Sequence, residues 1–406
     1  MESNGRAPEE NESNSDLPQP GSPARKHGID VDGKASQILD ACKWKDIEKL
    51  RALATSTGGL VSDHVRRQAW PLLLGLPSHD GTEDDTPWKL LPKHRDEDQV
   101  QLDVNRSFIY YPNDQSDKDL TRRKEELSEL ITEVLRRQPY LCYFQGYHDI
   151  CQVFLLVLEP SARAPTVARL STLRIRDFML PTLAPALAQL RLIPAILNAV
   201  NPELRNHLSQ TQPFFALSGT LTMYAHDIQE YGDIARLFDV LLARESVFSV
   251  YMFAQIVLQR SHELFETPAD EPEMLHSILS KLPKPLDLEA LILGTVDLFK
   301  KYPPEQLKPW RSISHCSVLK TARWQDQILN QSLDDGEAYF KRQVRELEWA
   351  QKRDKAFRTI WKYRKPASTI GLAVVVGVLS YWLRKSSIMS EVFEGLRRQC
   401  YRYLYH

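Results

Sequence analysis

The sequence predicts an all-α protein, and three features of its 406 residues point to that class. Apolar residues recur mostly at the three- and four-residue spacing of amphipathic helices. Alternating apolar and polar segments joined by Asn-Gly or Asp-Gly turns, which are typical of β-hairpins, are missing. The chain also lacks a Gly-rich phosphate loop after a strand, which argues against a doubly wound α/β enzyme. We therefore expect a multi-helix domain.

The first segment, residues 1–35, is predicted to be a disordered tail. It is rich in Glu, Ser, Asn, Pro and Gly and has few large apolar residues. Such a segment cannot bury enough surface to offset its chain entropy. It also lacks the basic and apolar regions of a signal peptide, so we expect the start of the chain to stay in the cytosol.

An all-helical domain is predicted over residues 36–322. Its first helix has Ile38, Cys42 and Leu50 on one face, and the next begins at the N-cap residue Ser62. Another helix stops before Pro139, because the residue before a proline disfavours helical geometry. The expected helices are Ser36–Ala54, Ser62–Leu76, Asp117–Pro139, His148–Pro160, Arg176–Val200, Ile234–Glu245 and Val247–Phe265.

A charged helical stalk is predicted over residues 323–365, followed by a single transmembrane helix over 366–383 and a short tail over 384–406. The run PASTIGLAVVVGVLSYWL has no charged residue and lies between Lys365 and Arg384. As a helix it would rise roughly 27 Å at 1.5 Å per residue, close to the hydrocarbon thickness of an endoplasmic reticulum bilayer. We expect a carboxy-terminal anchor in an endoplasmic reticulum or early secretory membrane, with the helical domain facing the cytosol. A buried core helix is the alternative interpretation of this run.

The net charge and the spacing of the cysteines argue against several classes of function. A formal net charge of −1 gives no sign of a nucleic-acid binder, which usually carries a basic excess. The five cysteines are scattered and form no CxxC pair, which argues against a structural zinc site and a disulfide framework. The bulk of the chain is therefore predicted to be cytosolic and reduced.

Two short motifs carry the candidate chemistry. The first, VQLDVNR, sets Asp103 three residues before Arg106, a spacing that on a helix would give an ordinary surface ion pair. The second, YFQG, places Gln145 beside the start of an apolar helix, where backbone is exposed. Gly146 after it would let another group approach the main chain closely. Taken alone, Gln145 would be a solvated turn residue and Tyr143 a core aromatic.

In order and separation, these residues resemble the signature motifs of the TBC-domain Rab GTPase-activating proteins. Val100-x-x-Asp103-x-x-Arg106 is similar to the family's I-x-x-D-x-x-R motif, and Tyr143-x-Gln145-Gly146 to its Y-x-Q-G motif. Upstream, Arg66 and Trp70 match an R-x-x-x-W pattern. Downstream, PFFALSGTLTMYAHDI and IARLFDVLL are similar to the W-F-x-x-L-F and R-L-W-D segments. The resemblance covers roughly residues 60–250, with departures at Val100, Phe214 and Tyr147.

The resemblance implies a GTPase activator whose partner is a GTP-bound Rab. GTP hydrolysis builds charge on the transferred phosphoryl group, and an arginine from a partner protein accelerates it about 10³- to 10⁵-fold. The resemblance assigns Arg106 as this arginine finger and Gln145 as a glutamine finger that orients the attacking water. We expect Asp103 to orient Arg106, Tyr143 to fix its loop, and Arg66 and Trp70 to be structural. No metal site, no cofactor and no turnover of its own are expected, because GTP and Mg²⁺ belong to the Rab.

Three alternatives remain open. A non-catalytic, membrane-anchored Rab-binding scaffold would normally have lost Arg106 or Gln145. An HD-type metal phosphohydrolase is suggested by His148-Asp149 and His226-Asp227, but it needs further ligands that converge on a metal. A purely structural membrane protein leaves the large helical domain without a role.

Overall fold

The computed structural model describes residues 30–76, 86–112, 116–385 and 394–400, and within these ranges the protein is helical with no strand. The all-α prediction is confirmed. Most of the predicted tail, residues 1–29, lies outside the described residues. Residues 1–343 form one compact unit and residues 344–406 a second, and each is described by itself.

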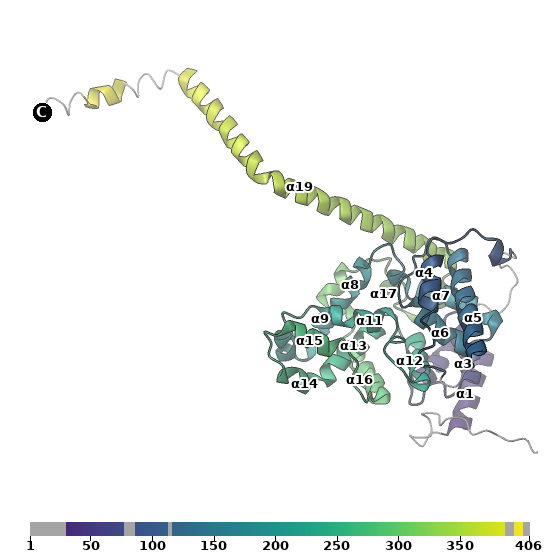
Figure 1. Ribbon diagram of the computed structural model, residues 1–406. Coiled ribbons are helices and arrows are strands. Elements are labelled where there is room, and N and C mark those ends of the chain that lie inside the picture. Colours follow the sequence, from purple (N-terminus) through teal and green to yellow (C-terminus); the bar gives the residue numbers. More distant parts are fainter. Residues whose placement is uncertain (1–29, 77–85, 113–115, 386–393, 401–406) are drawn as a thin grey trace, which may run out of the picture. The chain divides into compact units, whose positions relative to one another are not determined.

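The first half of the larger unit carries both candidate motifs (Figure 1). Within it, α5 packs against α4, α6 and α7, and α3 packs against α1 and α6. Its helices are α1 (Val31–Trp44), α2 (Ile47–Thr55), α3 (Asp63–Leu73), η2 (Trp88–Leu90), α4 (Glu97–Val104), α5 (Asp117–Arg137), α6 (Tyr147–Val157) and α7 (Pro160–Leu173).

The second half of the larger unit is built around α13, which packs against α9 and α16 (Figure 1). Helix α12 joins the two halves, because it contacts α2 and α3 as well as α16. The helices are η3 (Arg176–Phe178), α8 (Ala184–Leu190), α9 (Leu192–Val200), α10 (Pro202–His207), η4 (Pro213–Ala216), α11 (Leu217–Leu221), α12 (Tyr231–Ala243), α13 (Phe248–Gln259), α14 (Ser261–Glu266), α15 (Pro272–Leu279), α16 (Leu288–Lys301), η5 (Pro304–Gln306), η6 (Lys308–Ser312), α17 (Val318–Thr321), α18 (Gln325–Asn330) and the start of α19 (Leu333–Lys385).

Several predicted boundaries are wrong. Helix α1 begins at Val31 rather than at residue 36, because the Asp30 carboxylate accepts a hydrogen bond from the Gly33 amide at 3.0 Å and caps the helix. The predicted helix 36–54 is two helices, broken at Lys45, which has a positive φ of 53°. The predicted helices 176–200 and 247–265 are likewise broken, and α7 was not expected.

The predicted stalk, residues 323–365, does not separate cleanly from the domain. Phe340 and Gln343 in the first turns of α19 are buried in the larger unit. The Phe340 ring lies 5.0 Å from the Tyr140 ring, and Gln343 accepts a hydrogen bond from the Arg176 guanidinium at 3.0 Å. In the second unit, Trp349 and Phe357 of the same helix are exposed.

The apolar run, residues 366–383, lies within α19, which ends at Lys385. Side chains at 366–372 and 383 lie outside the described residues, as do residues 386–393 and 401–406 of the predicted tail. Over the part of the chain that is described, no helix combines the length and apolarity that crossing a membrane requires.

A buried aspartate, Asp239 of α12, ties the two halves of the larger unit together. It is fully buried and accepts hydrogen bonds from the Arg66 guanidinium at 3.0 Å to each carboxylate oxygen. It also accepts from the Trp70 indole and the Leu60 amide, both at 2.9 Å. Burial alone would lower the pKa of Arg66, but Asp239 and Asp63 raise it above its usual value, so the guanidinium stays charged. Arg66 and Trp70 are thus structural groups at the junction of α3 and α12.

The buried Asp239–Arg66 ion pair gives a stability prediction. Asp239→Ala leaves the buried Arg66 guanidinium without its main counter-charge, so we expect a loss of about 3–5 kcal/mol in the free energy of unfolding. Urea denaturation followed by circular dichroism measures it. Asp98→Ala is the matched control, because Asp98 is exposed and pairs with exposed Lys93. If the Asp239 variant were as stable as this control, Asp239 would not stabilise the junction of α3 and α12.

Candidate functional site

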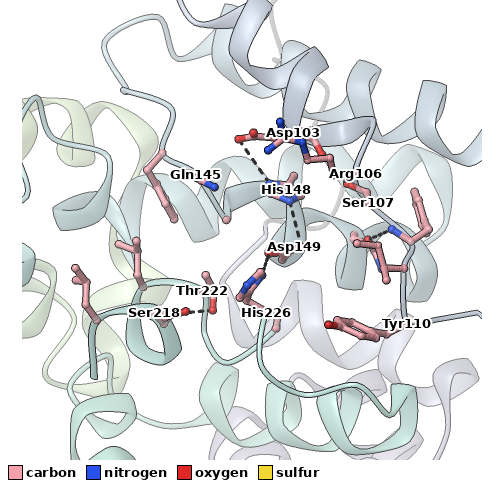
Figure 2. Close-up of a pocket in the computed structure, with 18 of the residues that line it drawn as sticks. Asp103, Arg106, Ser107, Tyr110, Gln145, His148, Asp149, Ser218, Thr222 and His226 are labelled. Carbon is pink, nitrogen blue, oxygen red and sulfur yellow. Dashed lines mark hydrogen bonds and ion pairs between the residues drawn. The ribbon is translucent and has the colours of Figure 1, made fainter. Parts of the chain in front are cut away.

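The two candidate motifs open into one cavity of about 590 Å³ (Figure 2). Its walls come from the end of α4 and the segment after it, the turn before α6 and the first half of that helix, Leu183 just before α8, and α11 with the loop after it. Lining side chains include Asp103, Arg106, Ser107, Phe108, Ile109, Tyr110, Tyr111, Phe144, Gln145, Gly146, His148, Asp149, Gln152, Leu183, Leu217, Ser218, Leu221, Thr222, Ala225 and His226.

Arg106 lies in the turn that follows α4, not on the helix as the i, i+3 spacing suggested. Helix α4 ends at Val104, and the Arg106 amide donates to the Asp103 carbonyl at 3.0 Å. The Lys124 ammonium donates to the Asn105 carbonyl at 2.7 Å and satisfies a backbone acceptor at this helix end. Arg106 itself is exposed, and among the described residues its guanidinium has no ion-pair or hydrogen-bond partner.

Gln145 lies in the turn before α6 and is also exposed. The next residue, Gly146, is the N-cap of that helix and has φ of +100°, a conformation that side chains other than glycine rarely adopt. A Cβ at this position would lie 2.6 Å from Cγ2 of Thr222. Gly146 is therefore required both by the backbone conformation and by the close approach of the α11 side of the cavity.

The Asp103 carboxylate does not pair with Arg106, which corrects the expectation that Asp103 orients the guanidinium. Asp103 faces inward, where its side chain accepts from the Tyr143 hydroxyl at 2.9 Å and from the Gln99 amide at 3.0 Å. Arg106 lies beyond the helix end and is exposed. Figure 2 shows Asp103 directed toward His148, and Arg106 beside it.

Tyr143 connects the two motifs. Its amide donates to the Asp96 carboxylate at 2.9 Å, and its hydroxyl donates to Asp103, so both ends of the residue are tied to α4 and its N-cap. Burial, reinforced by the Asp103 charge, raises the pKa of Tyr143 well above its usual value and keeps the hydroxyl protonated as a donor. Tyr143 thereby fixes the distance between the turn that carries Gln145 and the helix that precedes Arg106.

A buried glutamine that the motifs did not indicate fixes the loop after Arg106. Gln152 of α6 accepts from the Phe108 amide at 3.0 Å and donates to the Tyr111 carbonyl at 3.3 Å. Phe108 has a positive φ of 62°, which this clamp supports. The available signal was the position of Gln152 itself, a polar residue inside the apolar run HDICQVFLL.

The cavity also gathers His148, Asp149 and His226, which the sequence had suggested only in connection with a metal phosphohydrolase. Asp149, in the first turn of α6, lies 3.2 Å from Nε2 of His148 and 3.0 Å from Nδ1 of His226. No group of three or more His, Cys, Asp or Glu side chains suited to a metal ion occurs within the described ranges. Figure 2 shows His226 joined to Asp149, on the loop after α11.

The three departures from the family pattern fall in different environments. Val100 and Tyr147 are fully buried, and the Tyr147 hydroxyl lies 2.6 Å from the Ser171 hydroxyl. Phe214 is about half exposed, at 49%. Neither buried residue lines the cavity.

Comparison with known proteins gives consistent matches. Residues 63–265 match the sequence model of the Rab-GTPase-TBC domain, which is half of the chain. TBC1 domain family member 20 of Bos taurus is 36% identical over 281 residues, covering 68% of this chain and 68% of that protein. The human protein of the same name is 36% identical over 264 residues, covering 64% and 65%. GTPase-activating protein gyp10 of Schizosaccharomyces pombe is 33% identical over 318 residues, covering 77% and 84%.

The alignment spans about two thirds of the length of the family-member-20 proteins. The motifs, taken together with the apolar carboxy-terminal run, predict a likeness to this family member, and the matches confirm it.

The geometry around Gly146 predicts a specific double-mutant result. Gly146→Ala should destabilise the protein by about 1–3 kcal/mol, because it combines an unfavourable φ with a clash against Thr222. Thr222→Ser removes the clashing methyl group, so the double variant should recover the steric part of the loss and not the backbone part. Thermal unfolding measures all three variants.

Gly395→Ala serves as the control, because an added Cβ there meets no atom within 4 Å. Strictly additive effects of the Gly146 and Thr222 changes would show that the two positions are not in contact.

Proposed function

Because the chain belongs to the Rab-GTPase-TBC family, we propose that it accelerates GTP hydrolysis by a Rab-family small GTPase through two side chains supplied in trans, Arg106 and Gln145. One observation carries the assignment. Both side chains are exposed, line the same cavity, and have no side-chain partner among the described residues. A docked protein can therefore receive both of them without any internal interaction being broken.

The arginine has the chemistry that the reaction requires. As GTP is cleaved, negative charge grows on the transferred phosphoryl oxygens and on the leaving group. A guanidinium remains protonated and presents a planar fork of donors that matches phosphate oxygens. Since Arg106 forms no ion pair with any residue that the structure describes, its charge is available to the transition state without first leaving a carboxylate.

The glutamine has a complementary task. A carboxamide can accept a hydrogen bond from the attacking water through its oxygen while its nitrogen donates a hydrogen bond to the reacting group. Gln145 lies in a turn held on one side by Tyr143 and on the other by Gly146, so only its side chain remains to be ordered on docking. Limiting that motion reduces the entropy lost when the complex forms.

GTP and Mg²⁺ are bound by the partner in this proposal, and the chain contributes positioning and charge. The protein is thus an activator of a reaction that another enzyme performs, with no turnover of its own. A scaffold that only binds a Rab would need neither a free arginine nor a free glutamine in the same cavity, so the catalytic interpretation is favoured.

We also propose that the apolar run at residues 366–383 anchors the protein in an endoplasmic reticulum or early secretory membrane, with the helical domain in the cytosol. The support is in the sequence: the run is uncharged, lies between basic residues, and has aromatic residues near both ends. Its short length suits the thinner bilayer of the endoplasmic reticulum. Such an anchor would place the domain beside Rabs that act early in secretion.

The activity is tested with a panel of GTP-loaded Rabs in single-turnover assays. Wild-type protein should accelerate hydrolysis by at least one member, and Arg106→Ala should reduce that acceleration by about 10³-fold or more. Gln145→Ala should remove most of it as well. Both variants should keep the wild-type unfolding midpoint, since neither side chain is packed.

Arg123→Ala is a suitable control, because Arg123 is a partly exposed arginine of α5 outside the cavity. Near-complete acceleration by Arg106→Ala would contradict the assignment. So would an equal loss in the Arg123 variant.

The anchor is tested by deletion. Removing residues 366–406 should move the protein from the carbonate-resistant membrane pellet to the soluble fraction, whereas removing only residues 386–406 should leave it in the pellet. The pelleted protein should sediment with an endoplasmic reticulum marker. Carbonate-resistant pelleting of the larger deletion would show that something else holds the protein on membranes.

A further inference from the structure

We propose that His226, held in place by Asp149, is a second cationic donor of the cavity and binds a hydrogen-bond acceptor on the polypeptide of the docked GTPase. This inference rests on the proposed function and goes further, because it assigns a partner-recognition residue. It also separates recognition from the chemistry at Arg106 and Gln145.

The first step of the argument is how His226 is held. Its Nδ1 lies 3.0 Å from Oδ2 of Asp149, and since a carboxylate only accepts, Nδ1 is the donor. The other carboxylate oxygen of Asp149 lies 3.2 Å from His148, so the acid is fixed between two imidazoles. The Asp149 side chain is only 16% exposed, which makes it a rigid support.

The second step is what His226 leaves free. Its side chain is 62% exposed, and within the described part of the chain its Nε2 has no partner. The hydrogen bond to Asp149 raises the pKa of His226 above its usual value, which increases the fraction of imidazolium at neutral pH. An imidazolium donates through both nitrogens, so Nε2 presents a charged donor to the cavity.

The third step concerns what kind of group occupies the cavity beside His226. The rim carries exposed apolar side chains, Ile109 at 72% and Leu183 at 43%, together with half-exposed Tyr110. Apolar and aromatic side chains around a polar centre are typical of a protein–protein interface. His226 therefore faces a protein surface, and its complement there is a carboxylate or a main-chain carbonyl.

The fourth step separates this role from catalysis. His226 lies in the loop after α11, whereas Arg106 follows α4 and Gln145 precedes α6, so a different segment of the chain carries it (Figure 2). A donor that contacts the partner polypeptide equally in the ground and transition states raises affinity and leaves the chemical step unchanged. A donor to the transferred phosphoryl group would instead raise kcat.

The experiment measures kcat and KM for a GTP-loaded Rab that the wild-type protein accelerates. His226→Ala should raise KM roughly 5- to 30-fold, with kcat changed less than about twofold. His226→Gln, which keeps a side-chain donor, should recover part of the loss. The same ranking of the His226 variants should appear in their binding affinity. This is measured in an Arg106→Ala background with the Rab loaded with a non-hydrolysable GTP analogue, so that no hydrolysis occurs.

Asp149→Asn tests the support. Combined with His226→Ala it should raise KM little beyond the single histidine variant, because Asp149 acts through His226. His262→Ala is the matched control: it too is an exposed histidine beside a carboxylate, Glu266 at 3.4 Å, but it lies on α14 outside the cavity.

The outcomes separate the two proposals. An unchanged KM and affinity in His226→Ala, beside an active wild type, would overturn the role of His226 and leave the proposed function standing. A fall in kcat at constant KM would also overturn it, because that would place His226 in the chemistry. If the wild-type protein accelerates no Rab of the panel, the proposed function fails and this inference fails with it.

Discussion

The hydrogen bond between the Tyr143 hydroxyl and the Asp103 carboxylate, 2.9 Å long, is the contact on which the arrangement of the cavity depends. It joins the end of α4 to the turn before α6. The buried carboxylate accepts a hydrogen bond from a hydroxyl whose pKa is raised well above its usual value by burial, so the contact is a charge-assisted bond of fixed direction. Because Asp103 is committed to Tyr143, the neighbouring Arg106 is exposed and has no ion-pair partner within the described segments. One interaction thus fixes the motifs relative to each other and frees the arginine.

Around that bond the backbone is held in place, so each functional side chain can move only by changing its rotamer. Gly146 accepts a positive φ and the close approach of Thr222, and Gln152 clamps the loop after Arg106 from the middle of α6. Helix α6 therefore supports both walls of the cavity, and Asp149 in its first turn extends the same support to His226. Rigid support of a few exposed groups is what binding a transition state on another protein requires, since ordering costs are met before docking.

The sequence predicted the helical class and the pair of motifs well, because both depend on local patterns. Periodic apolar residues marked most helices, and the order of the short motifs marked the family. The sequence did not predict the break at Lys45, because no proline or glycine marks it. Lys45 adopts a left-handed conformation, and Asp46 then caps the next helix. The helix boundaries and the burial of Phe340 against Tyr140 also depend on long-range packing.

The same distinction holds at the site. Arg106 and Gln145 were found because their motifs are local, whereas the partner of Asp103 was misassigned because Tyr143 is distant in sequence. Gln152 and His226 were missed as members of the cavity for the same reason. The central claim is that Arg106 stabilises a transition state on a docked Rab, and binding to a transition-state mimic tests it most directly. Wild-type protein should bind the Rab loaded with GDP and aluminium fluoride far more tightly than the Rab loaded with GDP alone, and Arg106→Ala should lose that preference. Equal preference in the two proteins would contradict the account.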